Sequence, residues 1–133
     1  MRLSTKSEYA CLALIDLSER ANEGLVKIED IARRKKIPKK YLEQILLMLN
    51  HAGYLRSKRG SDGGYRLSKK PGEISIAEII RLMDGPLAPV GSVSKFFYDE
   101  SPIEQSEKFI ILLREIRDYI SDKLEKTTFA DLL

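Results

Sequence analysis

The first third of the chain alternates between apolar runs at helical spacing and short polar breaks. Residues 5–8 (TKSE) fit a capping box, in which a Thr hydroxyl and a Glu carboxylate satisfy free amides at a helix start. The residues after this cap predict a first helix that is apolar nearly all round and therefore buried. The turn residues 22–24 are expected to end it. A short second helix follows, with a cluster of cations at its end, residues 33–36. Its apolar face is Ile28, Ile31 and Ala32.

Pro38 separates this second pattern from a third. Proline disfavours helical geometry in the residue before it but fits the first turn of a new helix. A third helix is therefore expected to begin near Pro38 and to stop at Ala52-Gly53. Its apolar face is Tyr41, Leu42, Ile45, Leu46 and Leu49, and its other face carries Lys39, Lys40, Glu43, Gln44 and, further on, His51.

Residues 54–58 and 65–68 predict the two strands of a β-hairpin. The loop between them contains Asp62-Gly63, a dipeptide typical of hairpins that need positive φ. A second capping box, Ser75 to Glu78, opens a fourth helix that ends at residues 84–86. An irregular connector follows; its aromatic cluster, residues 96–98, is expected to pack on its own core rather than to form a docking surface or an effector lid.

A final helix of about 25 residues, 102–126, would extend ~36 Å. A short helix with a Thr-x-x-Asp cap is expected at residues 128–132. The apolar face of the long helix is too broad to be buried on one small domain, so a second copy is the expected partner; folding back on its own subunit is the alternative. The expected dimerisation residues are Phe109, Ile110, Leu113, Ile116, Ile120 and Leu124.

These elements predict a mainly α fold with a small β-hairpin wing. Residues 1–84 form a winged helix-turn-helix domain, 85–101 a connector, and 102–133 the long dimerisation helix with its short C-terminal helix. In such a domain an α-helix enters the major groove of DNA and reads base edges with the residues of its N-terminal end.

Charge favours the same interpretation. Residues 27–70 hold 13 Lys and Arg against four Asp and Glu, whereas the rest of the chain has a net charge of −6. Such a block favours a polyanionic partner, although a solvated basic face is the alternative from charge alone.

Gln can pair with adenine, Glu can accept from cytosine, and a wing Arg suits a narrow minor groove. The expected DNA-binding residues are Lys39, Lys40, Tyr41, Glu43, Gln44, Lys58, Arg59, Gly60, Gly63 and Gly64, the glycines allowing close approach to phosphates.

Other chemistry is poorly represented. The single cysteine, Cys11, and the single histidine, His51, are expected to be structural, and no metal site is expected. The chain has no P-loop, dinucleotide-binding or nucleophile-elbow motif, so an enzyme is not expected. It has neither signal-peptide architecture nor a transmembrane run, so a reducing cytoplasm without membrane contact is the expected setting.

Three stretches resemble the signature of the Rrf2 family of bacterial regulators: residues 41–46 (YLEQIL), 52–60 (AGYLRSKRG) and 63–67 (GGYRL). The start (Thr5, Lys6 and Tyr9) and the closing residues 127–133 (TTFADLL) fit as well. The resemblance implies a homodimeric winged-helix repressor on a pseudo-palindromic operator. It would place Glu43 and Gln44 in the major groove and Arg59 in the minor groove.

One departure from the family concerns cofactors. Iron–sulfur members carry three cysteines in the connector, and residues 91–104 of this chain have none, so no cofactor is expected. The chain is more similar to cluster-free members, which implies a metabolic enzyme or a small effector as a further partner. A winged-helix module that binds an acidic protein, without specific DNA binding, is the alternative function.

Overall fold

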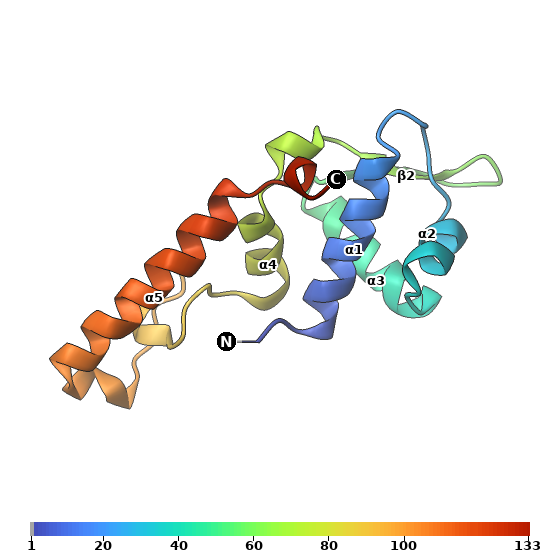
Figure 1. The fold of residues 1–133 in the computed structure, drawn as a ribbon. Coiled ribbons are helices and arrows are strands. Elements are labelled where there is room, and N and C mark those ends of the chain that lie inside the picture. The colour runs from blue at the N-terminus through green and yellow to red at the C-terminus, as the bar shows by residue number, and fades with distance from the viewer. Residues whose placement is uncertain (1) are drawn as a thin grey trace.

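The structure, a computed structural model, describes residues 2–133 and confirms a mainly helical fold with one small hairpin (Figure 1). The helices are α1 (Thr5–Glu19), α2 (Ile28–Lys35), α3 (Lys39–His51), α4 (Ile76–Asp84) and α5 (Glu107–Lys126). The antiparallel strands are β1 (Leu55–Lys58) and β2 (Gly64–Leu67). Short 3₁₀ turns lie at Pro71–Glu73, Gly91–Val93, Pro102–Gln105 and Phe129–Leu132.

Helix α1 is the centre of the core, with α2, α3 and α4 packed around it. Each surrounding helix buries one apolar stripe, as its periodicity predicts. Fully buried side chains include Leu14, Leu17, Ile31, Leu42, Ile45, Leu46, Leu49 and Ile79. Burying such a side chain contributes about 1.5–3 kcal/mol relative to leaving it exposed, so this cluster is the main source of stability.

Helix α1 begins one residue earlier than its predicted cap implies. The N-cap is Ser4, whose Oγ accepts a hydrogen bond from the Ser7 amide at 3.1 Å, and the predicted cap at Thr5 is wrong. Ser4 has a second partner in the carboxylate of Asp84 at the end of α4, to which its amide donates at 3.0 Å and its hydroxyl also donates. The cap therefore joins the start of α1 to the end of α4. The predicted capping box of α4, Ser75 with Glu78, is confirmed.

Helix α5 is shorter than predicted, because it begins only at Glu107. The Ser106 Oγ accepts a hydrogen bond from the Phe109 amide at 3.3 Å and caps the helix there. The preceding residues 102–105 form a separate 3₁₀ turn. A serine in this position offers the backbone an alternative to the helical pattern, which apolar periodicity alone does not reveal.

The hairpin pairs Leu55 with Leu67 and Lys58 with Gly64, leaving residues 59–63 as its tip. The positive φ of the tip lies at Gly60 (+101°) rather than at the predicted Asp62-Gly63. Gly63 is needed for space, because a Cβ there would lie 2.1 Å from the Lys58 carbonyl oxygen. Val26 extends the wing by exchanging two backbone hydrogen bonds of 2.8 Å with Tyr65.

The C-terminal residues return to the helix-turn-helix end of the molecule, although α5 projects away from it (Figure 1). The final turn has its predicted cap, Thr128 with Asp131, and inserts Phe129 into the same core as α1. The far half of α5 packs on the connector instead, in a separate small cluster of Val93, Ile110 and Leu113. No helix in residues 2–133 is both long and apolar enough to cross a membrane.

The identity of the α1 cap can be tested by alanine substitution. We expect Ser4→Ala to lower the free energy of unfolding by about 1 kcal/mol, because an N-cap hydrogen bond is lost. Thr5→Ala is the matched control and should change it by less than about 0.5 kcal/mol. Urea unfolding of both variants measures the difference, and a larger loss for Thr5→Ala would contradict the assignment.

Candidate nucleic-acid interface

The turn between α2 and α3 sets the direction of α3. Lys36 ends α2 in the left-handed conformation (φ 55°), and the buried side chain of Ile37 anchors the turn in the core. The Ile37 amide donates to the carbonyl of Ala32 at 3.0 Å, and Pro38 then occupies the N-cap of α3. The sharp change of direction is that of a helix-turn-helix, with α3 in the position of the reading helix.

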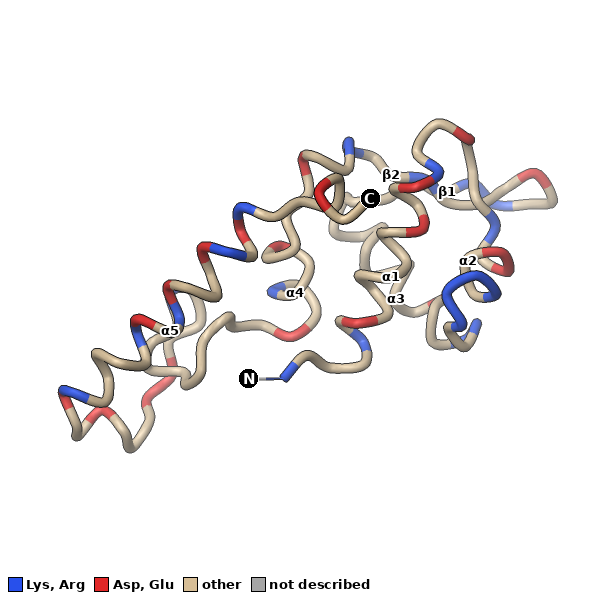
Figure 2. Tube along the Cα trace, viewed as in Figure 1, with Lys and Arg blue, Asp and Glu red and all other residues tan. Residues whose placement is uncertain are grey.

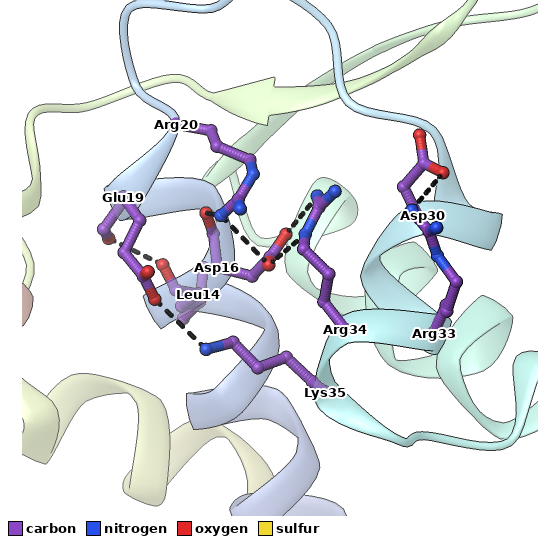
Figure 3. A network of polar contacts seen from close by, with 9 residues as sticks. Leu14, Asp16, Glu19, Arg20, Asp30, Arg33, Arg34 and Lys35 are labelled. Carbon is purple, nitrogen blue, oxygen red and sulfur yellow. Dashed lines mark hydrogen bonds and ion pairs between the residues drawn. The ribbon is translucent and has the colours of Figure 1, made fainter.

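A buried ion pair holds α2 against α1 (Figure 3). Asp16 of α1 is 0% exposed and accepts hydrogen bonds from Arg34 of α2, Nε to Oδ1 at 2.8 Å and Nη2 to Oδ2 at 2.9 Å. Arg20 adds a third contact, Nη1 to Oδ1 at 3.3 Å. The hydrogen bond with Asp16 raises the pKa of Arg34, and the two-pronged geometry fixes orientation as well as distance.

The sequence prediction missed this network and treated the cations ending α2 as one charged cluster. The structure divides them: Arg34 faces α1, and Lys35 pairs with Glu19, Nζ to Oε1 at 3.1 Å. Lys36 is exposed. The available signal was Asp16 itself, a carboxylate in an otherwise apolar run that needs a cationic partner when buried.

Helix α3 presents its polar N-terminal face to solvent. Lys39, Lys40, Glu43 and Gln44 are all exposed, whereas the apolar residues on the other face are buried. Tyr41 is the exception in the predicted apolar face, because it is exposed and its ring meets Tyr9 edge-on, with centroids 5.4 Å apart. Four side chains that can contact base edges or phosphates therefore lie together at the start of this helix.

Contacts through α2 connect the start of α3 to the wing. Lys39 Nζ lies 3.0 Å from Glu29 Oε1, and the hydrogen bond with Glu29 raises the pKa of Lys39. Lys27, the N-cap of α2, donates from Nζ to the Ser61 carbonyl at the wing tip, at 2.9 Å. The first turn of α2 thus lies between the N-terminus of α3 and the tip of the hairpin.

The predicted wing residues differ in their accessibility. Lys58 at the end of β1 is exposed, as are Arg59 and Gly60 at the tip, so all three can reach a ligand. Gly63 is buried, and Gly64 approaches Val26 so closely that a Cβ would lie 2.6 Å from the Val26 carbonyl oxygen. The structure thus gives Gly63 and Gly64 a role inside the hairpin.

Charge segregates along the molecule. Figure 2 shows Lys and Arg gathered around α2 and the hairpin, whereas α5 carries both signs along its length. The exposed cations at the wing end include Lys36, Lys40, Arg56, Lys58, Arg59 and Arg66. This basic surface suits a polyanion such as DNA.

Side chains that can bind a metal are scattered over the described part of the chain rather than grouped. Within residues 2–133 no three His, Cys, Asp or Glu side chains are grouped so that they could hold a metal ion. Burial, and secondarily the charge of Asp84, raises the pKa of Cys11 to about 11, so its thiol is protonated at neutral pH and is a poor nucleophile. His51 is exposed at the end of α3.

Helix α5 has two different apolar faces, and the predicted dimerisation residues are divided between them. Ile110 and Leu113 are buried against the connector of the same chain, and Leu124 packs on the helix-turn-helix core. The apolar face left open consists of Phe109, Leu112, Ile116 and Tyr119, hereafter the α5 seam. Their spacing of three, four and three residues places them on one side of the helix, as in a coiled-coil seam. Tyr119 was not part of the apolar face predicted for this helix.

The prediction that the aromatic connector packs on its own core is wrong. Phe96 is 67% exposed, and Phe97 and Tyr98 are exposed as well. Phe96 lies beneath the guanidinium of Arg81, 4.8 Å from ring centroid to Cζ, and Tyr98 donates its hydroxyl hydrogen to Glu104 at 2.6 Å. Polar contacts thus accompany the exposed rings of Phe96 and Tyr98.

A reading helix, a basic wing beside it and a helical arm define a winged helix-turn-helix DNA-binding protein. The family model described as Rrf2, iron-dependent transcriptional regulator, matches residues 3–133. The chain therefore belongs to the Rrf2 family, is a DNA-binding transcriptional regulator and is not an enzyme.

Similar proteins cover nearly the whole chain. The transcriptional regulator CymR of Bacillus subtilis is 35% identical over 99% of this chain and 89% of its own length. Its solved structure, described as the global cysteine regulator of B. subtilis, superposes with a TM-score of 0.80 over 99% of this chain and 95% of that one, at 34% identity. The structure of T. potens IscR gives a TM-score of 0.76 at 30% identity, over 99% of this chain and 85% of the other.

Asp16 can be tested as the residue that positions the reading helix. We expect Asp16→Asn to lower the free energy of unfolding by about 3 kcal/mol, because it leaves Arg34 without its counter-charge. Glu19→Gln, which removes an exposed pair on the same helix, is the control and should cost less than about 0.5 kcal/mol. Equal decreases in the free energy of unfolding, measured by urea unfolding, would show that the buried pair stabilises the fold no more than the exposed pair does.

Proposed function

We propose that this protein is a homodimeric repressor that reads a pseudo-palindromic operator. Each copy inserts the N-terminal end of α3 into the major groove, where Glu43 and Gln44 contact base edges, and the wing brings Arg59 to the adjacent minor groove. The observation that carries the proposal is the continuous exposed surface from Lys39 through the first turn of α2 to the wing tip.

The homodimer is supported by the α5 seam. Two copies of Phe109, Leu112, Ile116 and Tyr119 facing one another would remove from water an apolar stripe that one chain leaves exposed. Twofold symmetry then presents two reading helices to two half-sites, one or two helical turns apart. We propose repression because a dimer bound over both half-sites excludes other proteins from the same stretch of DNA. We propose the cytoplasm as the setting in which it acts.

We further propose that this regulator works without an iron–sulfur cluster, although its family is described as iron-dependent. The donor set does not fit a cluster, because the connector has no cysteine and Cys11 lies in α1 with a raised pKa. A metabolic enzyme or a small effector would then supply the signal, and the exposed rings of residues 96–98 offer a surface for it.

A salt titration on DNA fragments of different sequence distinguishes specific DNA binding from the alternative function, a module that binds an acidic protein. Affinity for DNA fragments selected from the source genome should fall with salt at a slope of about −0.9 per phosphate contact. A protein-only module would show no preference among DNA sequences.

The proposed contacts of α3 with base edges predict that removing either side chain weakens the preference for the operator sequence. Glu43→Ala and Gln44→Ala should each reduce discrimination against mismatched operators by about 1–3 kcal/mol, because a base contact is lost. Fluorescence anisotropy with matched and single-mismatch duplexes measures this. His51→Ala, at the other end of the same helix, is the control; unchanged discrimination in both α3 variants would exclude their role in reading bases.

The proposed contact between the wing and DNA predicts that removing a wing cation changes the salt dependence of operator binding. Arg59→Ala should weaken operator binding and make the slope of log affinity against log salt shallower by up to about 1, because one cation leaves the interface. Arg114→Ala, at an exposed arginine of α5, is the control and should leave the slope unchanged. An unchanged slope in Arg59→Ala would argue against a wing contact with DNA.

The α5 seam allows a closely matched pair of variants. Ile111 and Leu112 are 48% and 50% exposed, but adjacent helix residues point to different sides, and only Leu112 belongs to the seam. We expect Leu112→Asp to dissociate the dimer in sedimentation equilibrium, because it buries a charge in the interface. Ile111→Asp should remain dimeric. The same response from both variants would contradict the proposed interface.

A further inference from the structure

The C-terminal turn ties α5 to the reading domain. Phe129 is 0% exposed and lies in the core cluster centred on α1. Its amide donates to the Ile74 carbonyl at 3.1 Å, and the Ile76 amide donates to the Thr127 carbonyl at 2.9 Å. This antiparallel bridge fixes the end of α5 beside the start of α4.

A second attachment lies within the last two turns of α5. Arg81 of α4 donates from Nη2 to Ser121 Oγ at 3.2 Å and to Glu125 Oε1 at 2.6 Å. Arg81 is largely covered (19% exposed), with Phe96 of the connector on its guanidinium face. The two attachments use different chemistry, one apolar and one ionic, and together they restrain the direction of the helix.

That direction determines where a partner copy places its own reading helix. A helix of 20 residues is ~30 Å long, so a rotation of about 10° at its attached end moves the far end by ~5 Å. One base-pair step is only about 3.4 Å. The α5 seam lies toward the far end, so small changes at Phe129 or Arg81 would change the distance between the two reading helices by more than a base pair.

We propose that Phe129 and Arg81 are positioning residues that set the half-site spacing this protein accepts. The inference rests on the proposed dimeric, DNA-binding function. Neither residue belongs to the exposed face of α3, to the wing tip or to the α5 seam, so neither is placed to contact DNA or the partner copy directly. Loss of either attachment broadens the range of accepted spacings while each reading domain keeps its own affinity for a half-site.

The test measures affinity against a series of duplexes in which two selected half-sites are separated in one-base-pair steps. The wild type should show one optimum, with affinity about tenfold lower two base pairs away. Phe129→Ala and Arg81→Gln should lose about five- to tenfold at the optimum and vary less than about threefold across the series. Single half-site affinity and the dimer constant should stay within about twofold of wild type.

Leu133→Ala, at an exposed residue of the same C-terminal segment, is the matched control and should keep the wild-type profile. If Phe129→Ala does not fold, Arg81→Gln, which removes only a partly exposed pair, decides the question. A sharp wild-type profile retained by the folded, dimeric variants overturns the inference. A broad wild-type profile with intact operator binding also overturns it, and leaves the proposed function standing. A wild type that is monomeric or shows no preference among DNA sequences overturns both.

Discussion

The pairing of Asp16 with Arg34 is the constraint on which the reading surface depends. A fully buried carboxylate is tolerated only when its charge is matched and its oxygens accept hydrogen bonds, and here a guanidinium supplies both in one geometry. Apolar packing also holds α2 against α1, but hydrophobic contacts have little directionality. The two-pronged bond fixes the register.

The consequences of that constraint run along the chain. With α2 fixed, the left-handed Lys36 and the buried Ile37 set the direction of α3, and Lys27 at the start of α2 contacts Ser61 at the wing tip. The cations that remain exposed at this end favour a polyanion, whereas α5 at the other end has mixed charge and an open apolar seam. DNA reading and self-association thus occupy separate parts of one small chain.

Much of this was predictable from periodicity and from cap chemistry. The buried stripe of α3, the Ser75–Glu78 box and the Thr128–Asp131 cap are local patterns, and the structure confirms them. The exposed face of α3 follows from the same stripe, so the placement of Glu43 and Gln44 at the surface was also within reach of the sequence.

What could not be predicted depends on contacts between distant residues. Ser4 caps α1 in place of Thr5 and also meets Asp84, which is 80 positions away. The apolar residues of α5 are spaced so that either of two helix faces could form a coiled-coil seam. The connector covers Ile110 and Leu113, and this long-range contact determines which face stays exposed. The ion pair of Asp16 is of the same kind, because nothing local to α1 identifies its partner.

The central claim, that two symmetry-related copies each place α3 and a wing on one duplex, is tested most directly by hydroxyl-radical footprinting. The protein bound to an operator selected from the source genome should protect two equivalent regions whose centres lie one or two helical turns apart, about 10 or 21 base pairs. A single protected region, or protection that does not depend on DNA sequence, would contradict it.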